Sequence, residues 1–381
     1  MADSPILIVG GGIAGLAVSL GLAKIGKPTQ VLEKAARFET VGAGLQLGPN
    51  AVRALQYLGA WDAVAPACVS PEEIHIRDAI SGNTLQRIIL GTAFEMRFGA
   101  PYRVAHRTDL QNALIACAQG QSTIQLQNGA EVVNVSISET SLTLKSGETR
   151  KAPAILAADG IHSIVRNAML PGSAPNSTGH TLFRQLIPID AVPSCIETNV
   201  ITLWLYPGGH VVHYAVSQGK QFNVVASLQS TGATPDSAFQ NACTPLSDLL
   251  NGHRQWLEWR AFDLTPNPNW SMNKTVTIGD AAHASLPYLA QGAAMALEDA
   301  CVLTRILHSG RNATQAFEDF STQRFMRTSK IRQKSRQLGR LYHATGNWRL
   351  ARNLALKITP PRVFMNRLKW IYQWQDDKGD I

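Results

Sequence analysis

The chain has few cysteines, and their spacing indicates neither a metal site nor a disulfide framework. The five cysteines are odd in number, and no two have the Cys-x-x-Cys spacing. No group of histidines and cysteines has the spacing typical of zinc ligands, so we predict no metal. The sequence also shows no secretory signal, and we therefore expect reduced thiols and a cytoplasmic location. The cysteines are Cys68, Cys117, Cys195, Cys243 and Cys301.

Long hydrophobic runs are also scarce. Residues 6–23 carry no charge and approach the length of a membrane span. However, the glycines clustered at 10–15 would weaken a helix in lipid, only Asp3 precedes the run, and Pro28–Glu33 reads as a buried strand directly after it. We therefore predict no membrane span. There is also no low-complexity tract and no repeat, and 45% hydrophobic with 16% charged residues is an ordinary globular composition.

Negative charge is scarce towards the C-terminus. Residues 324–381 hold 14 Lys and Arg against three Asp, a local balance of +11 in a chain of net charge +8. Such a tail could contact nucleic acid or anionic lipid. Because Leu, Trp and Ile interleave with the charges at helical spacing, we predict a solvated helix face and no nucleic-acid partner. Attraction of anionic substrates and dinucleotides is a further hypothesis.

The elements expected near the N-terminus form a βαβ unit. A strand at Ile6–Val9 is followed by a glycine turn, an apolar helix to about Ile25 and a strand at Thr29–Glu33. A further helix begins near Arg107, where Thr108 and Gln111 have the spacing of a capping box. More strands are expected at Val132–Val135, Leu142–Leu144, Ala154–Ala158 and Thr275–Ile278, and a helix at Gly292–Leu307.

The middle of the chain has a different pattern. Asn199–Tyr206, His210–Val216 and Gln221–Leu228 alternate and are separated by turn residues, which predicts an antiparallel meander. The sequence therefore predicts an α/β protein in which a nucleotide-binding domain is interrupted by a β-sheet domain. The expected bounds are 1–70, 100–175 and 270–320 for the first domain, 71–99 and 176–269 for the second, and 321–381 for C-terminal helices.

The glycine turn has the spacing of a dinucleotide fingerprint. Gly10 permits the tight turn, Gly12 lets the backbone approach a pyrophosphate, and Gly15 lets the helix pack on the strand. Glu33 ends the second strand, where a carboxylate can accept hydrogen bonds from ribose hydroxyls. The fingerprint alone does not distinguish FAD from NAD. The neighbouring Ile13, Ala14 and Lys34 complete the predicted cofactor-binding set around this turn.

Further motifs make the assignment specific. The segments Asp159–Arg166, Gly279–His283, Leu286–Ala300 and Gly42–Asn50 resemble FAD-dependent aromatic hydroxylases. The resemblance is to the branch of salicylate hydroxylase, 3-hydroxybenzoate 6-hydroxylase and 6-hydroxynicotinate 3-monooxygenase, and it covers essentially the whole chain. It implies a Rossmann-like FAD-binding domain of the glutathione-reductase type, interleaved with a β-sheet substrate domain and followed by a helical C-terminus.

The resemblance also implies a function. It implies non-covalent FAD, NADH or NADPH as a transient reductant, and O2 as a co-substrate. The reaction is hydroxylation of a small phenolic or heteroaromatic acid through a flavin hydroperoxide. A homodimer is compatible with this reading, and the sequence does not decide it.

The same motifs nominate residues on the flavin side. Asp280 follows a strand and could bond a ribityl hydroxyl, or it could cap a helix. Arg107 could pair with the pyrophosphate, or form a surface ion pair. Asp159 is associated with FAD and NAD(P)H in the family, or it could pair with Arg166. A helix whose positive end would favour reduced flavin begins at Gln291, Gly292 and Ala293.

Strand parity nominates the catalytic residues. Along His210–Val216, His210 and Tyr214 point to one face and His213 to the other. The resemblance implies a histidine and, four residues on, a tyrosine at this strand, so we predict His210 as base and Tyr214 as substrate contact. His213 is the rival candidate, and a structural, hydrogen-bonded histidine is the alternative for His210.

The substrate itself is less defined. Gln46 and Tyr288 replace histidines of the hydroxynicotinate enzyme type, and Pro287 replaces a glutamine of the 3-hydroxybenzoate 6-hydroxylase type. These departures argue against both substrates. Arg184 could bind a carboxylate through its planar guanidinium, or brace the sheet. We take Gln46, Arg184, Pro287 and Tyr288 as the candidate substrate-binding residues.

Other function classes share the FAD motifs, namely a non-hydroxylating flavin oxidoreductase, the branch of epoxidases, ubiquinone-type hydroxylases and halogenases, and a non-catalytic FAD-fold protein. A flavin epoxidase and a non-hydroxylating flavin oxidoreductase would differ only in their product. A non-catalytic FAD-fold protein should lose the motifs at Gly279–Asp280 and Gln291–Gly292, which are intact here. A halogenase is disfavoured because Trp204–Pro207 is not its Trp-x-Trp-x-Ile-Pro motif.

Overall fold

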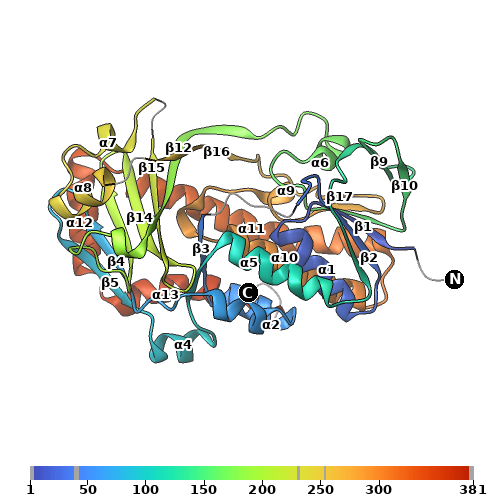
Figure 1. Cartoon of the computed structure of the whole chain (residues 1–381), viewed down its shortest axis with the longest axis horizontal. Helices are drawn as coiled ribbons and strands as arrows, with labels where there is room; N and C mark the ends of the chain where they lie inside the picture. The colour runs from blue at the N-terminus through green and yellow to red at the C-terminus, as the bar shows by residue number, and fades with distance from the viewer. Residues whose placement is uncertain (1–3, 38–42, 230–231, 253–254, 377–381) are drawn as a thin grey trace.

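The protein is described by a computed structural model over residues 4–37, 43–229, 232–252 and 255–376. Two large sheets lie at opposite ends of the molecule, and long helices run between them (Figure 1). Gly42, the first residue of one predicted motif, lies outside the described residues.

All four residues of β1 (Ile6–Val9) are apolar, and successive side chains point to opposite faces of the first sheet, so both faces are covered. Ile6 and Ile8 belong to a core shared with helices, whereas Leu7 and Val9 belong to a core shared with a small sheet. The large sheet has the order β17-β18-β11-β1-β2-β7, and all its pairs are parallel except β17–β18. The other strands are β2 (Thr29–Leu32), β7 (Ile124–Gln127), β11 (Ile155–Ala157), β17 (Ser271–Met272) and β18 (Thr275–Thr277).

Helices cover one face of this sheet and a three-stranded sheet covers the other. The helical side holds α1 (Ile13–Lys24), α5 (Arg107–Gln119) and α10 (Gly292–His308). The opposite side holds the three-stranded sheet of β8 (Val132–Ser136), β9 (Ser141–Leu144) and β10 (Thr149–Lys151). The predicted βαβ unit and its surrounding strands are therefore confirmed.

The second sheet contains the predicted meander. Its order is β16-β12-β15-β14-β13-β4-β5, and only the pair β13–β4 is parallel. These strands fall within the ranges predicted for the second domain, although the domain bounds themselves remain a prediction. The strands are β4 (Glu73–Asp78), β5 (Thr84–Ile89), β12 (Asn176–Pro188), β13 (Ile201–Tyr206), β14 (Gly209–Val216), β15 (Gln221–Leu228) and β16 (Leu257–Asp263).

A two-stranded ribbon links the two ends of the molecule. It pairs β3 (Gly44–Leu47) with β6 (Arg103–His106) in antiparallel register. Short elements fill the remaining connections. They are α2 (Pro49–Tyr57), α3 (Trp61–Val64), η1 (Ala65–Ala67), α4 (Thr92–Phe98), α6 (Ile164–Met169), η2 (Ile189–Ala191), α7 (Pro235–Ala238), α8 (Thr244–Asn251), α9 (Asp280–His283) and η3 (Pro287–Leu289).

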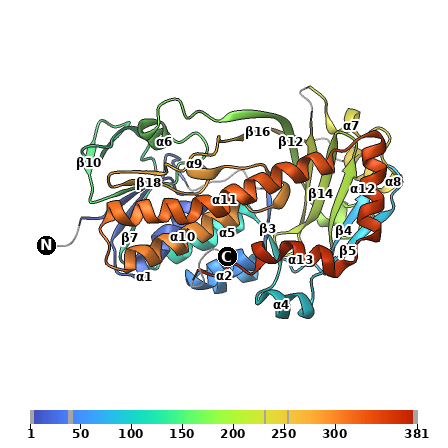
Figure 2. The same ribbon diagram turned by 180° about the vertical axis from the view of Figure 1, so that it is seen from behind.

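The C-terminal part is helical, as predicted. Helix α11 (Ala313–Tyr342) runs past both sheets when the molecule is seen from behind (Figure 2). It crosses the boundary predicted at residue 320 without a break. Two further helices, α12 (Gly346–Ile358) and α13 (Pro361–Tyr372), follow it beside the second sheet.

The basic charges of this region are not all on a solvated face, so that prediction is wrong in part. Arg324, Arg327 and Arg332 of α11 are buried, and Arg352 of α12 is buried as well. Burial is tolerated because each guanidinium donates to carboxylates, an amide oxygen or backbone carbonyls. Within the described ranges, no helix is long and apolar enough to cross a membrane.

Candidate active site

The glycine turn between β1 and α1 leaves a space in front of the helix. Gly10 has a φ of +103°, and a Cβ there would lie 2.4 Å from the carbonyl oxygen of Ala158. A Cβ on Gly15 would lie 2.0 Å from the oxygen of Gly10. At Gly12, by contrast, a Cβ would meet nothing within 4 Å. Gly10 and Gly15 therefore serve close packing, while Gly12 leaves the helix N-terminus open to a phosphate.

The carboxylate of Glu33 lies beside this turn. One oxygen accepts a hydrogen bond from the amide of Gly11 at 2.8 Å, and the other accepts from the amide of Ala35 at 2.9 Å. The side chain of Gln111 donates to the oxygen of Gly11 at 2.8 Å and holds the turn from the other side. Lys34 follows Glu33 and is exposed. The turn thus presents a fixed carboxylate where the fingerprint requires one.

The capping box predicted at Thr108 and Gln111 is wrong. Helix α5 begins earlier, at Arg107, and its N-cap residue is His106, which makes no side-chain capping bond. The reason is that β6 runs directly into α5 without a loop, so the side chain of Gln111 is free to reach the glycine turn.

Arg107 and Asp159, two of the predicted cofactor-binding residues, each have a buried side-chain atom without a hydrogen-bond partner among the described residues. The amide of Arg107 donates to the oxygen of Ala43, but its Nε has no partner among the described residues. One oxygen of Asp159 accepts from the amides of Ile164 and Val165, at 2.9 and 3.4 Å, and the other has no partner within the described part of the chain. Burial raises the pKa of Asp159 despite these hydrogen bonds.

The alternatives weighed for these two residues are not what the structure shows. No ion pair in the described ranges involves Arg107. The guanidinium of Arg166 does not pair with Asp159 and instead donates to the carbonyls of Ala281, Ile161 and Ser173. Arg166 therefore braces the loops, and Asp159 remains available to a ligand.

The second predicted FAD motif lies against the first. Gly279 has a φ of +58°, and a Cβ there would lie 2.8 Å from the Cβ of Ala14 in α1. This close approach places the exposed Asp280, the first residue of α9, next to the helix N-terminus. Asp280 is not the N-cap of α9, because Gly279 occupies that position.

The N-terminus of α10 is open in the same way. Gln291 is the N-cap residue, and its side-chain oxygen accepts from Asn50 at 2.9 Å. Gly292 is exposed, a Cβ there would meet nothing within 4 Å, and Ala293 is half-buried. The start of α10 is therefore open at Gly292, and the positive end of the helix favours a negative partner there.

The predicted substrate side forms one face of the second sheet. His210 pairs with Ser227, and Tyr214 pairs with Asn223, so their side chains share a face. Asn223 accepts a hydrogen bond from the amide of Gly44 at 2.8 Å. A Cβ on Gly44 would lie 2.6 Å from the ring of Tyr214. This face is therefore turned towards β3 and the cofactor-binding half.

Two of the other predicted pocket residues, Gln46 and Tyr288, contact this face. Tyr102 donates to the side-chain oxygen of Gln46 at 2.6 Å, and Gln46 also reaches Tyr214. The hydroxyl of Tyr288 lies 3.3 Å from Ser227, and its ring centroid is 5.3 Å from that of His210. Pro287 is exposed at the start of η3.

Arg184 is a partly buried cation on the same face. Its guanidinium carbon lies 5.6 Å from the ring centroid of Trp259, and its Nε has no partner among the described residues. Burial lowers the pKa of Arg184, and the nearby Arg107 adds to this effect whereas Tyr214 opposes it. Arg184 is therefore suited to an incoming carboxylate.

His213 is not brought together with these residues. It points to the opposite face of β14, into the core covered by α7 and α8. Its Nε2 accepts a hydrogen bond from the indole of Trp204 at 2.9 Å, and its ring packs on Phe222. Because alternate residues of a strand face opposite sides, His213 and His210 cannot both meet one ligand.

These observations fit a flavin dinucleotide. Open helix N-termini at Gly12 and Gly292 suit the pyrophosphate and the pyrimidine edge of the ring, and Glu33 suits the ribose. Arg107 and Asp159 offer buried atoms that lack partners in the described chain. Among the described residues, no cluster of His, Cys, Asp or Glu could hold a metal ion.

Comparison with known proteins decides the family. A family profile described as an FAD binding domain matches residues 3–334. Over 387 aligned residues the chain is 36% identical to 3-hydroxybenzoate 6-hydroxylase of Polaromonas naphthalenivorans, covering 98% of this chain and 96% of that enzyme. The chain belongs to the FAD-dependent aromatic hydroxylases.

Other relatives agree with this assignment. The hydroxylase is 33% identical to 3-amino-4-hydroxybenzoate 2-monooxygenase of Streptomyces cremeus, covering 90% of this chain and 88% of that enzyme. A salicylate hydroxylase in complex with substrate superposes with a TM-score of 0.81 at 25% identity, covering 99% and 97% of the two chains. HpxO of Klebsiella pneumoniae, bound to FAD and uric acid, shares the fold with a TM-score of 0.84 at 21% identity over 96% of each chain.

The predicted family, fold class, FAD cofactor and monooxygenase class are therefore confirmed. The assignments of individual site residues remain predictions that the geometry supports to different degrees.

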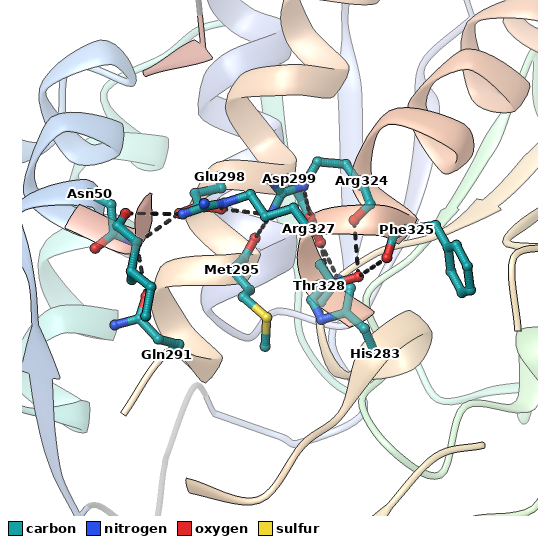
Figure 3. Close-up of polar contacts among 12 residues, drawn as sticks. Asn50, His283, Gln291, Met295, Glu298, Asp299, Arg324, Phe325, Arg327 and Thr328 are labelled. Carbon is teal, nitrogen blue, oxygen red and sulfur yellow. Dashed lines mark hydrogen bonds and ion pairs between the residues drawn. The ribbon is translucent and has the colours of Figure 1, made fainter. Parts of the chain in front are cut away.

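A buried charge network supports the two loops that are predicted to bind FAD, at Gly279–His283 and Gln291–Ala293, and the sequence analysis assigned it no role. Figure 3 shows that it joins α2, α10 and α11. Glu298 accepts from Asn50 at 2.7 Å, from Arg324 at 2.8 Å, and from both Nε and Nη2 of Arg327 at 2.7 Å. Because Asn50 also donates to Gln291, the network reaches the N-terminus of α10.

The neighbouring Asp299 holds the predicted FAD-binding loop that begins at Gly279. It accepts from the amide of Gly279 at 2.9 Å, from His283 at 2.6 Å and from Arg324 at 2.8 Å. Burial acts to raise the pKa of Asp299, but His283 and Arg324 outweigh it and the pKa is lowered. Adjacent acids in an otherwise apolar helix, with two arginines three residues apart downstream, are the sequence signal that could have revealed this network.

Proposed function

We propose that the protein hydroxylates a small phenolic acid, with monohydroxybenzoates as the substrate class, and uses NADH or NADPH to reduce its FAD. The proposal is supported by the 3-hydroxybenzoate 6-hydroxylases among its relatives, which match nearly its full length. The observation that carries the residue assignment is the shared face of His210 and Tyr214, turned towards β3 and the flavin-side loops. A cytoplasmic location belongs to the same proposal and is supported by five free thiols.

FAD, when bound and reduced, activates oxygen for transfer to the ring. The residues that would hold it are Glu33 at the ribose, Arg107 at the pyrophosphate and Asp280 at the ribityl chain. The α10 N-terminus at Gly292 would face the flavin ring and stabilise negative charge there. The network behind Gly279 keeps these loops in place.

His210 is the proposed base. Burial, together with the nearby His343 and His180, lowers the pKa of His210 well below its usual value, so the imidazole is neutral at physiological pH. A phenol has a pKa of about 10, and full proton transfer to such a base is uphill in the ground state. Transfer becomes favourable as oxygen adds to the ring, because the phenolic proton of the oxidised ring is far more acidic. His210 therefore acts in the transition state.

Tyr214 and Arg184 are proposed to orient the substrate. Burial raises the pKa of Tyr214, with Arg184 and Gln46 opposing, so its hydroxyl stays protonated and can donate a hydrogen bond. Arg184 lies close enough to Tyr214 to lower the pKa of its hydroxyl. No ion pair in the described ranges involves Arg184. A carboxylate bound to Arg184 would place the ring beside Tyr214, with the hydroxyl group directed along β14 towards His210.

The proposal is tested with purified protein containing FAD. NADH and NADPH oxidation is followed with 3-hydroxybenzoate, 4-hydroxybenzoate, salicylate and hydroxypyridine carboxylates, and product masses are recorded. Pro287 stands where the 3-hydroxybenzoate 6-hydroxylase type carries a glutamine, so the proposal names the substrate class, and the product identifies the compound and the ring position attacked. One ring that accelerates oxidation and gains one oxygen supports the proposal. Loss of reductant with no oxygenated product from any phenol would favour a non-hydroxylating oxidoreductase or an epoxidase.

A matched pair of variants on one strand tests the base. His210→Asn should lower the rate of coupled hydroxylation by about 10²-fold or more while FAD content is unchanged. His213→Gln, on the opposite face, keeps an acceptor for Trp204 and should leave the rate near that of the parent. Equal rates in the two variants would remove His210 from the mechanism.

A further inference from the structure

His210 makes a hydrogen bond to a second histidine that lies far away in the sequence. Its Nδ1 is 2.8 Å from Nε2 of His343, and the two rings stack with centroids 5.1 Å apart at 28°. Both side chains are buried. Among the described residues the ring of His210 has this hydrogen bond alone, so its Nε2 remains available to a substrate hydroxyl.

The backbone holds His343 firmly against β14. His343 is the C-cap residue of α11, and its amide donates to the oxygen of Gly339 at 3.1 Å. Its own carbonyl accepts from the amide of Gly208, in the turn that leads into β14, also at 3.1 Å. The ring of Tyr288 packs directly on the last turn of α11, since a Cβ on Gly339 would lie 2.4 Å from it. The imidazole of His343 is thus fixed by the helix end and by the strand it contacts.

The direction of this hydrogen bond decides whether His210 can be a base. A neutral imidazole carries one proton, on either Nδ1 or Nε2. If His210 donates from Nδ1, its Nε2 has a lone pair that can accept the phenolic proton. If His343 donates instead, Nε2 of His210 carries the proton and cannot serve as a base. A base is commonly kept in its productive tautomer by a third group that accepts from its other nitrogen.

The groups around the pair keep the imidazole of His343 neutral. Tyr342 from α11, Tyr288 from η3 and His180 from β12 face the two imidazoles. The contacting rings of this group have centroids 5.1–6.3 Å apart. Ser227 of β15 lies opposite His210, and the charged Arg352 of α12 acts on His343. Burial, then His180 and Arg352, lower the pKa of His343 to about 3. His343 is therefore uncharged, with one proton and one lone pair on its two ring nitrogens, and its buried Nδ1 has no hydrogen-bond partner among the described residues. An acceptor role for Nε2 places the proton on Nδ1.

We propose that Nε2 of His343 accepts a hydrogen bond from Nδ1 of His210 and so positions His210 as the base. The proposal rests on the proposed function of His210. As the substrate O–H bond breaks, the Nε2–H bond of His210 forms, and His343 stabilises the resulting positive charge. The ring later loses its carbon-bound proton to solvent and becomes aromatic, and His210 returns the first proton to the phenolic oxygen. His343 is a positioning residue and does not touch the substrate.

The test compares His343→Phe with His343→Gln. Phenylalanine keeps the ring stack but has no acceptor, whereas the glutamine amide oxygen can reach the place of Nε2 and accept. We expect His343→Phe to lower kcat for hydroxylation by about 10–10²-fold with KM little changed, and His343→Gln to restore most of the loss. The pH profile of kcat should move in the phenylalanine variant and return in the glutamine variant. Far-UV circular dichroism and FAD content verify folding.

A second readout does not depend on turnover. ¹⁵N-histidine NMR of the FAD-bound protein should show His210 protonated at Nδ1 in the parent and in His343→Gln. It should show loss of that single tautomer in His343→Phe. Parent-like kcat, pH profile and tautomer in His343→Phe would overturn the proposal. If this variant does not fold, His343→Asn, whose amide is too short to reach the place of Nε2, is compared with His343→Gln, and equal profiles in the two overturn it.

The two proposals fail in different ways. If His210→Asn hydroxylates like the parent, the assignment of the base fails whatever His343 does. If His210→Asn is inactive but His343→Phe behaves like the parent, only the role of His343 fails.

Discussion

Removal of Arg324 should destabilise the hydroxylase more than any surface charge change. Its side chain is fully buried and donates to Asp299 and to Glu298, each at 2.8 Å. Breaking a buried ion pair by removing one partner costs about 3–5 kcal/mol, because the remaining charge is left without its counter-ion. Both carboxylates keep other donors, so we expect Arg324→Leu to cost about 3 kcal/mol, near the lower end of that range. Weaker FAD retention should accompany it, since Asp299 holds Gly279.

The assay is urea unfolding followed by tryptophan fluorescence, with FAD content measured from absorbance. Asp299→Asn and the double variant complete a cycle. Because the two residues touch, the double variant should lose less than the sum of the single variants, by about 1–3 kcal/mol. The matched control is Arg311→Ala in the exposed pair Arg311–Asp319, whose side chains are 50% and 48% exposed. Such a pair contributes about 1 kcal/mol at most.

The reasoning would be refuted by a loss in Arg324→Leu no greater than that in Arg311→Ala. Additive losses in the Asp299 cycle would refute the direct coupling instead, even if Arg324 proved important for packing.

Two further perturbations follow from the structure. Gly12→Ala should fold normally but retain FAD poorly, because its methyl group enters the open space before α1. Gly15→Ala should unfold at a lower urea concentration, because its methyl group meets the oxygen of Gly10. Equal urea midpoints in the two variants would contradict this. Burial lowers the pKa of His213 and of His343 to about 3, so between about pH 6.5 and 3 the unfolded chain binds more protons than the folded one. The free energy of unfolding should therefore decrease as the pH is lowered through this range, by about 1.4 kcal/mol per pH unit for each such histidine. His213→Gln should reduce the slope of unfolding free energy against pH by one histidine's share, and an unchanged slope would show that His213 is already protonated in the fold.

The cofactor half could be predicted from sequence because its signals are local. The strand at Ile6–Val9, the glycine turn and Glu33 lie within one βαβ unit, and each feature has a reason that operates over a few residues. The same holds for the face shared by His210 and Tyr214, which follows from the two-residue period of a strand once the strand is recognised.

What could not be predicted depends on contacts between distant segments. The predicted capping box is wrong because β6 leads directly into α5, and the side chain of Gln111 bonds the glycine turn of another element instead. The arginines of α11 were assigned to a solvated face because helical spacing gives a face but does not say what covers it. Their partners, Glu298 and Asp299, lie on a different helix, and nothing in the periodicity of either segment pairs them.

Helix α11 joins the two halves of the site, and the boundary predicted at residue 320 falls within it. Near its middle, Arg324 and Arg327 neutralise the acids that hold the loops predicted to bind FAD. At its end, His343 contacts the proposed base. The two points are 19 residues apart, or about 28 Å along a straight helix at 1.5 Å per residue. Because a helix is stiff over this length, the register that seats Arg324 on Asp299 also fixes the distance of His343 from β14. A variant that shifts α11 should therefore impair FAD retention and hydroxylation together, whereas a change confined to His343 should impair hydroxylation alone.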